Sequence, residues 1–176
     1  MFYHGERVGK IAVKLREILL PDDTSKDEIM IVASLFHDVA KGIEPHGQYG
    51  ATLVREILNG YCDISEIEDI ADLIHCHQLR KKDTNFSEYV KIIQDADLLD
   101  HFGTIEIWMN FQYYAYADKP ITESVKFYNE QFDGHTMEIR NLLNFEVSQQ
   151  IFDDKITFQK MFTDRLAVEA KGEICI

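Results

Sequence analysis

The stretch from Ile29 to Gly42 constrains the fold of this chain more than any other part of its sequence. It begins with an almost unbroken apolar run, IMIVASLF, which predicts a helix that is apolar on nearly every side. We therefore expect that helix to lie in the centre of the fold. Ser25 and Glu28 have the spacing of a capping box at its start, and Gly42 is well placed to end it.

The end of this predicted helix carries an imidazole, a carboxylate and an ammonium group. At about 100° per residue, His37, Asp38 and Lys41 fall on neighbouring parts of its last two turns. Burying such groups is costly unless each finds a partner. A bound metal cation would partner the imidazole and the carboxylate together, and it would lie at the negative end of the helix dipole.

Helical periodicity continues along the whole chain, and no hairpin pattern interrupts it. The expected helices are 4–19, the second part of 43–60, one that opens at Ser65, one that starts near Ser87, and several between Thr104 and about Lys171. Ser65 and Glu68 form a second capping-box pattern, and we expect breaks at Pro120 and Gly134. The sequence therefore predicts an all-α fold, and its 176 residues suffice for one domain with its own core.

Composition excludes some classes of function. The formal net charge is −13, which argues against a nucleic-acid-binding groove because such a groove needs a basic face. It does not exclude small phosphate substrates, since metal ions can supply positive charge. The three cysteines form no C-x-x-C pair, and we find no signal peptide and no membrane-spanning run. We expect a cytoplasmic protein that does not bind membranes.

Five predicted helices each carry a histidine or an aspartate on the apolar stripe or at its end. His4 lies one turn before Val8, and Asp97 lies one turn after Ile93. A single such histidine is more often a hydrogen-bonded core residue than a metal ligand, but together these residues predict one metal site. The candidate ligands are His4, His37, Asp38, His46, His77 and Asp97. Imidazole and carboxylate ligands suit Fe, Mn, Co, Ni or Zn, and six of them allow one or two divalent ions.

His75 and His77 cannot both face one buried site, because they lie roughly 200° apart around a helix. The apolar line through Ile70 and Ile74 continues to His77, while His75 falls beside it. The sequence therefore predicts His77 as the ligand and His75 as a surface residue.

These residues resemble the motifs of the HD superfamily of metal-dependent phosphohydrolases. The similar pieces are HGERV at 4–8, the doublet HDVAK at 37–41, PHGQYGA at 45–51, IHCH at 74–77 and Ala96-Asp97. The segments around His46 and His77 resemble the small bacterial HD proteins that hydrolyse symmetrical dinucleoside tetraphosphates. Residues 94–100, with Gly103 after them, instead resemble another group of small bacterial HD proteins whose substrate is poorly defined.

The resemblance implies a single-domain HD-type helical bundle with additional C-terminal helices. The HD core would cover residues 1–115, and 116–176 would be a helical extension packed on it. Together with the chemistry of the ligands, it implies that Asp38 bridges two metal ions and is catalytic. His4, His37 and Asp97 would hold the first ion, and His46 and His77 the second.

Basic residues near these motifs are candidates for substrate binding. Lys41 is expected to bind a phosphate oxygen and to assist catalysis, with a surface ion pair as the alternative. Arg7 could bind phosphate or orient a carboxylate. Arg80, with Lys81 and Lys82, could guide an anionic substrate, or could belong to a solvated loop. Asp100, one turn after Asp97, is expected to support the site or to accept a proton.

The leading hypothesis is a metal-dependent phosphohydrolase acting on a small phosphorylated substrate, with a nucleotide as the favoured class. One alternative is an HD-fold enzyme with a non-nucleotide substrate. Another is a non-catalytic sensor that binds a nucleotide at a preserved metal site. The oligomeric state stays open, and a homodimer is compatible with the sequence.

Overall fold

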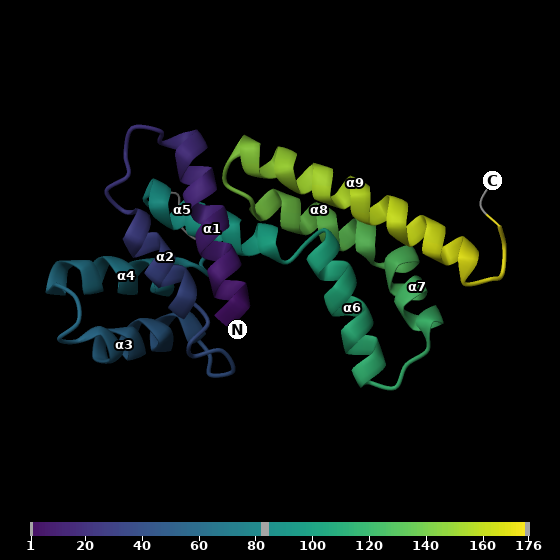
Figure 1. The fold of residues 1–176 in the computed structure, drawn as a ribbon, viewed down its shortest axis with the longest axis horizontal. Coiled ribbons are helices and arrows are strands. Elements are labelled where there is room, and N and C mark those ends of the chain that lie inside the picture. Colours follow the sequence, from purple (N-terminus) through teal and green to yellow (C-terminus); the bar gives the residue numbers. More distant parts are fainter. Residues whose placement is uncertain (1, 82–84, 175–176) are drawn as a thin grey trace. The chain divides into compact units, whose positions relative to one another are not determined.

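The computed structural model describes residues 2–81 and 85–174, and its regular elements are helices (Figure 1). This confirms the predicted all-α fold. The chain divides into two compact units, residues 1–100 and residues 101–176. None of the helices in the described ranges is long and apolar enough to cross a membrane.

The first unit contains five helices. They are α1 (Phe2–Leu19), α2 (Asp27–Phe36), α3 (His46–Leu58), α4 (Ile64–Cys76) and α5 (Glu88–Asp100). Helix α1 packs against α2 and α5, α3 pairs with α4, and α4 also contacts α2 and α5 (Figure 1). The stripes predicted for the first, fourth and fifth helices supply the core residues Val8, Leu15, Ile70, Ile74, Val90 and Ile93.

The helix predicted over 29–42 is shorter than expected. It ends at Phe36, and residues 37–42 form tight turns in which Val39 N–H bonds to the Phe36 carbonyl and Lys41 N–H to that of Asp38. The capping box at its start is also wrong, because the Ser25 hydroxyl donates to Asp23. Gly42 closes the turns with a φ of +102°, a conformation that favours glycine.

The most buried helix is α5, and not α2, which the apolar run predicted to lie in the centre of the fold. Ile31 on α2 is 41% exposed, whereas every residue from Ile92 to Asp100 is buried. Polar residues occupy several of these buried positions in α5. They can lie there because the surrounding helices carry partners for them, as described below.

Helices α3 and α4 differ in detail from their predicted patterns. The capping box of α4 lies two residues earlier than expected, where Asp63 N–H donates to the Glu66 carboxylate. The helical spacing of Gly50, Leu53 and Ile57 predicts that they form one buried apolar line. Helix α3 instead buries Gly47, Gly50, Ala51 and Val54, and Leu53 and Ile57 are exposed. Small residues occupy this face because they allow α3 to approach α4 closely.

The second unit contains α6 (Thr104–Tyr116), α7 (Ile121–Glu130), α8 (Phe132–Leu142) and α9 (Glu146–Glu169). The predicted break at Gly134 is wrong, because α7 ends before Gln131 and Gly134 lies inside α8. A polar chain links three of these helices: Tyr128 O–H and Gln159 both donate to the Glu106 carboxylate, and the Gly103 N–H donates to Gln159.

Candidate metal centre

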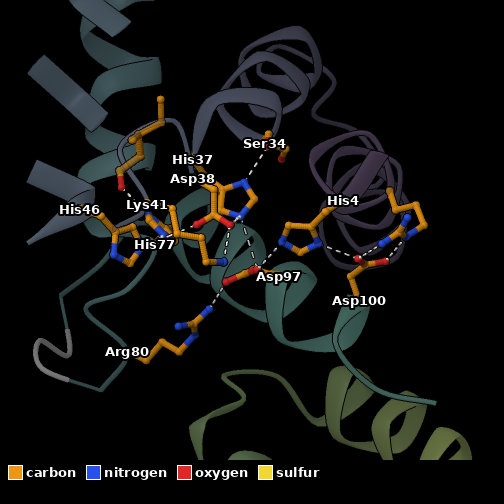
Figure 2. A network of polar contacts seen from close by, with 12 residues as sticks. His4, Ser34, His37, Asp38, Lys41, His46, His77, Arg80, Asp97 and Asp100 are labelled. Carbon is orange, nitrogen blue, oxygen red and sulfur yellow. Dashed lines mark hydrogen bonds and ion pairs between the residues drawn. The ribbon is translucent and has the colours of Figure 1, made fainter. Parts of the chain in front are cut away.

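Four imidazoles and two carboxylates from the first unit converge on one centre (Figure 2). His37 Nε2 lies 3.5 Å from Asp97 Oδ1 and 3.7 Å from Asp38 Oδ2. His4 Nε2 lies 3.2 Å from Asp97 Oδ1, and His46 Nε2 lies 3.7 Å from Asp38 Oδ1. His77 joins them, since its Nε2 lies 3.1 Å from that of His46. The structure therefore brings together all six ligands predicted from the sequence.

Two of these histidines occupy the same position at the ends of different helices. His37 is the C-cap of α2 and His77 is the C-cap of α4. Each ring donates its Nδ1–H to the carbonyl three residues earlier, Ser34 or Ile74, at 2.6 Å. A carbonyl only accepts hydrogen bonds, so Nδ1 carries the proton in both rings and Nε2 is the atom directed into the centre.

The other two histidines lie in the first turns of α1 and α3, and carboxylates hold their Nδ1 atoms. His4 Nδ1 lies 2.7 Å from Asp100 Oδ2, and His46 Nδ1 lies 3.0 Å from Glu44 Oε1. All four rings therefore direct Nε2 inward. Contacts of this kind fix the tautomer and orientation of metal-binding histidines.

A glycine follows each of these two N-terminal histidines, and it makes the close helix contacts possible. A Cβ on Gly5 would lie 2.6 Å from the Ser34 carbonyl oxygen, which accepts the hydrogen bond from His37. A Cβ on Gly47 would lie 3.1 Å from the Ile74 carbonyl oxygen, which does the same for His77. The same arrangement therefore occurs twice, in the pair α1–α2 and in the pair α3–α4. In each pair, a histidine followed by a glycine in the first turn of one helix lies next to the C-cap histidine of the other helix.

The possible metal-binding atoms form overlapping groups, and two of these groups share one carboxylate. His4, His37 and Asp38 form the first and Asp38, His46 and His77 the second, each with its donor atoms within 4.8 Å of one another. The shared carboxylate is the one predicted to bridge two ions. This arrangement has room for one ion or for two.

The hydrogen bonding shows that these residues fit a bound cation. With Nδ1 protonated in neutral rings, His46 and His77 would direct two Nε2 lone pairs at each other across 3.1 Å. Such an approach is favourable only with a proton or another cation between the rings. The buried His37 Nε2 likewise makes no hydrogen bond to any residue that the structure describes. The donor set thus suits a divalent transition metal.

The charge states of these groups also suit a cation. Burial lowers the pKa of His77 to about 4, so its ring is neutral at pH 7 and can act as a ligand. Burial disfavours the ionised form of Asp97, yet contacts with His37, His4 and Arg80 hold its pKa well below the ordinary value. For His4, hydrogen bonds to Asp100 and Asp97 outweigh burial and raise the pKa to about 9. A metal ion bound by His4 would replace its second proton.

The predicted substrate-binding cations contact acidic residues of the centre. Lys41 Nζ lies 2.5 Å from Asp38 Oδ2, and its side chain is 51% exposed. Arg80 donates to Asp97 Oδ2, and Arg7 binds Asp100 through two nitrogens at 2.8 Å. Lys82 lies outside the described residues.

The structure separates the two neighbouring histidines as predicted, since His77 is buried and His75 is exposed. Sequence reasoning missed Glu44, and the spacing of two residues between it and His46 was the only signal for it. It also missed Gly5 and Gly47, whose role depends on the neighbouring helices.

Comparisons with known proteins show the family and the fold of this chain. The model of the HD domain family matches residues 1–101. A predicted HD superfamily hydrolase from an uncultured Thermotogales bacterium is 24% identical, with a TM-score of 0.62, covering 95% of this chain and 79% of that one. An HD-superfamily hydrolase from Bacillus thuringiensis is 22% identical, with a TM-score of 0.66 and coverage of 97% and 86%.

Bacillus subtilis YpgQ is 17% identical, with a TM-score of 0.68, covering 93% of this chain and 85% of that one. No protein of curated function matches the chain. The match over residues 1–101 covers more than half of the 176 residues, and the His and Asp side chains of the centre all lie within it. The chain therefore belongs to the HD domain family and has the fold of HD-superfamily hydrolases.

Proposed function

We propose that this protein is a metal-dependent phosphohydrolase that cleaves a phosphate ester or anhydride of a small molecule. The observation that carries the proposal is the convergence of four inward Nε2 atoms on a shared carboxylate, Asp38. Two ligand groups with a common carboxylate are typical of two-metal hydrolytic sites.

His4, His37, Asp38 and Asp97 would hold one ion, and Asp38, His46 and His77 a second. A divalent metal supplies Lewis acidity at such a centre, because it polarises a phosphoryl oxygen and lowers the pKa of water. The protein's part is to hold its ligands in place before substrate arrives. The Nδ1 contacts and the close helix packing described above support that part of the proposal.

Lys41 and Arg80 are the proposed phosphate-binding residues. Each contacts an oxygen of a ligand carboxylate, so each lies within one side-chain length of the reacting group. Their positive charges would bind the phosphate oxygens and offset the negative charge that grows there in the transition state. Half-exposed Lys41 can reach a substrate that arrives from solvent.

We propose a nucleotide as the substrate class. The structure of Bacillus subtilis YpgQ in complex with ADP is 16% identical to this chain, with a TM-score of 0.65, and it covers 93% of this chain and 86% of that one. That complex is the reason to test ADP first. The motif segments around His46 and His77 add symmetrical dinucleoside tetraphosphates to the same test.

The test is elemental analysis followed by a substrate panel with the metal found. The panel contains mono- and dinucleotides, dinucleoside tetraphosphates and non-nucleotide phosphomonoesters. We expect one or two transition-metal ions per chain and metal-dependent release of phosphate or nucleotide. Asp38→Ala should abolish that release while retaining the helical circular dichroism. Asp22→Ala, which changes an exposed aspartate after α1, is the matched control and should behave as the wild type.

Two results would contradict the proposed hydrolase activity, and a third would contradict only the proposed substrate class. The hypothesis of a metal centre is wrong if the protein binds no metal and its melting temperature is unchanged by Mn, Fe, Co, Ni or Zn. Tight nucleotide binding without turnover of any panel member would instead support a sensor. Turnover of phosphomonoesters alone would retain the reaction type and exclude the nucleotide class.

A further inference from the structure

The two halves of the centre share a plan but differ in what holds their N-terminal histidine. We define the His4 half as His4, His37 and Asp97, and the His46 half as His46 and His77, with Asp38 common to both. In each half, one ring is fixed by a carbonyl and the other by a carboxylate. The two carboxylates, Asp100 and Glu44, lie in very different surroundings.

Asp100 lies in a buried and fully bonded position at the end of α5. Its side chain is 4% exposed, and its Oδ2 accepts from His4 Nδ1 at 2.7 Å. The Arg7 guanidinium binds both of its oxygens, Nε to Oδ1 and Nη2 to Oδ2, each at 2.8 Å. This bidentate contact leaves the carboxylate one orientation, so the ring of His4 has a rigid partner.

Glu44 lies in the turn before α3, and its side chain is 71% exposed. Its contacts are local: one oxygen lies 3.0 Å from His46 Nδ1, and the other accepts the His46 backbone N–H at 3.1 Å. Solvent screens an exposed carboxylate, and a flexible side chain loses entropy when it is held in one place. Glu44 is therefore a weaker constraint on His46 than Asp100 is on His4.

We propose that Asp100, held by Arg7, is a positioning residue for His4 and makes the His4 half bind its metal ion more tightly than the His46 half. The number of ligands also favours tighter binding in the His4 half. That half has three ligands besides the shared Asp38, and the His46 half has two. This inference rests on the metal centre of the proposed function. It assigns Arg7 to orienting a carboxylate rather than to binding substrate phosphate.

The experiment is a calorimetric titration of Mn²⁺ into the chelator-treated protein, with Co²⁺ in parallel. The wild type should show two binding steps of unequal affinity. Asp100→Asn keeps the shape of the side chain and removes its charge, and it should weaken the tighter step by about 10- to 100-fold while the weaker step stays. Glu44→Gln should change the weaker step alone, and by a smaller factor.

Arg7 provides a second variant that leaves Asp100 in place. Arg7→Gln should shift the tighter step in the same direction, and Arg7→Lys, which keeps the charge but loses the fork, should restore only part of the affinity. Lys10→Gln is the control, because the exposed Lys10 lies one turn further along α1 and pairs with the half-exposed Glu6. It should change neither step.

The outcomes distinguish this inference from the proposed function. Two unequal steps in the wild type that persist unchanged in Asp100→Asn and Arg7→Gln would overturn the positioning role and leave the hydrolase proposal standing. Two equal steps in the wild type would overturn the ranking of the two halves. Absence of any metal binding by the wild type would overturn the proposed function, and this inference with it.

Discussion

Replacement of Gly5 by alanine tests whether close approach of α1 and α2 builds the centre. The new Cβ would lie 2.6 Å from the Ser34 carbonyl oxygen and 2.9 Å from Leu35 Cα, both of them backbone atoms in α2. An ordinary contact begins at 3.4 Å, so the first is short by 0.8 Å and the helices must separate. Gly9→Ala, one turn later, is the matched control because its nearest atom would be Ile31 Cα at 3.4 Å.

The magnitudes follow from the two opposing effects of the added methyl group. Overpacking of this kind costs about 1–3 kcal/mol, while alanine is favoured over glycine within a helix by at most about 1 kcal/mol. We expect Gly5→Ala to lose about 1–2 kcal/mol and Gly9→Ala to lose nothing. A chain of this length should then melt about 2–8 °C lower in the first variant.

The same change should also weaken metal binding, because the displaced carbonyl holds the ring of His37. The assay is thermal melting followed by circular dichroism, with and without excess Mn²⁺. Metal should raise the melting temperature of the wild type and Gly9→Ala, and it should do so less for Gly5→Ala. Equal stability and equal metal response in the two variants would show that the close approach of α1 and α2 at Gly5 is not needed to build the centre.

Three further predictions concern single side chains. His77→Ala should remove one metal ion and most activity, while exposed His75→Ala should change stability by less than about 0.5 kcal/mol; metal analysis and melting check both. Lys41→Met should raise KM and lower kcat but retain the bound metal. Steady-state kinetics and elemental analysis check this, and unchanged kinetics or loss of metal would contradict it. Burial raises the pKa of Glu106, so the folded state binds its proton more readily and stability falls as pH rises through that pKa. Glu106→Gln keeps an acceptor for Tyr128 O–H and should lose this pH dependence in denaturant titrations, with stability at pH 7 no lower than that of the wild type.

The residues of the centre that could be predicted from the sequence are those that continue an apolar line at helical spacing. Asp97 and Asp100 continue the line of Val90 and Ile93 along α5, and all four are buried. His77 continues the line through Ile70 and Ile74 in the same way. A polar residue on such a line is visible in the sequence because its apolar neighbours set the orientation of the helix.

Other features depended on competition for backbone groups, which spacing does not reveal. The His37 ring donates a hydrogen bond to the Ser34 carbonyl. The backbone N–H groups of Val39 and Lys41 then bond to carbonyls three residues earlier, so tight turns follow in place of a continued helix. At the start of α2, Ser25 bonds to Asp23 rather than capping the helix. The Ser34 carbonyl and the Ser25 side chain each have two possible hydrogen-bond partners nearby. The sequence pattern alone favoured the partner that a regular helix would supply, and the structure has the other one.

The remaining features arise from contacts between elements. The face that α3 buries against α4 consists mostly of small residues. The prediction relied on large apolar side chains and therefore placed Leu53 and Ile57 on the buried face, but both are exposed. Glu44 reaches His46 because of the turn before α3, and no periodic pattern covers that turn. Such roles follow from the shape of the neighbouring helix rather than from the segment itself.

The proposed function depends on six side chains that hold metal ions around one shared carboxylate. Anomalous diffraction at the manganese edge, from crystals grown with Mn²⁺, would locate these ions. We expect two peaks about 3.5–4 Å apart, both bonded to Asp38, with His4, His37 and Asp97 around one and His46 and His77 around the other. The peak in the His4 half should have the higher occupancy at limiting Mn²⁺. Manganese found only at other residues, with none bonded to Asp38, would show that these side chains do not form a metal centre.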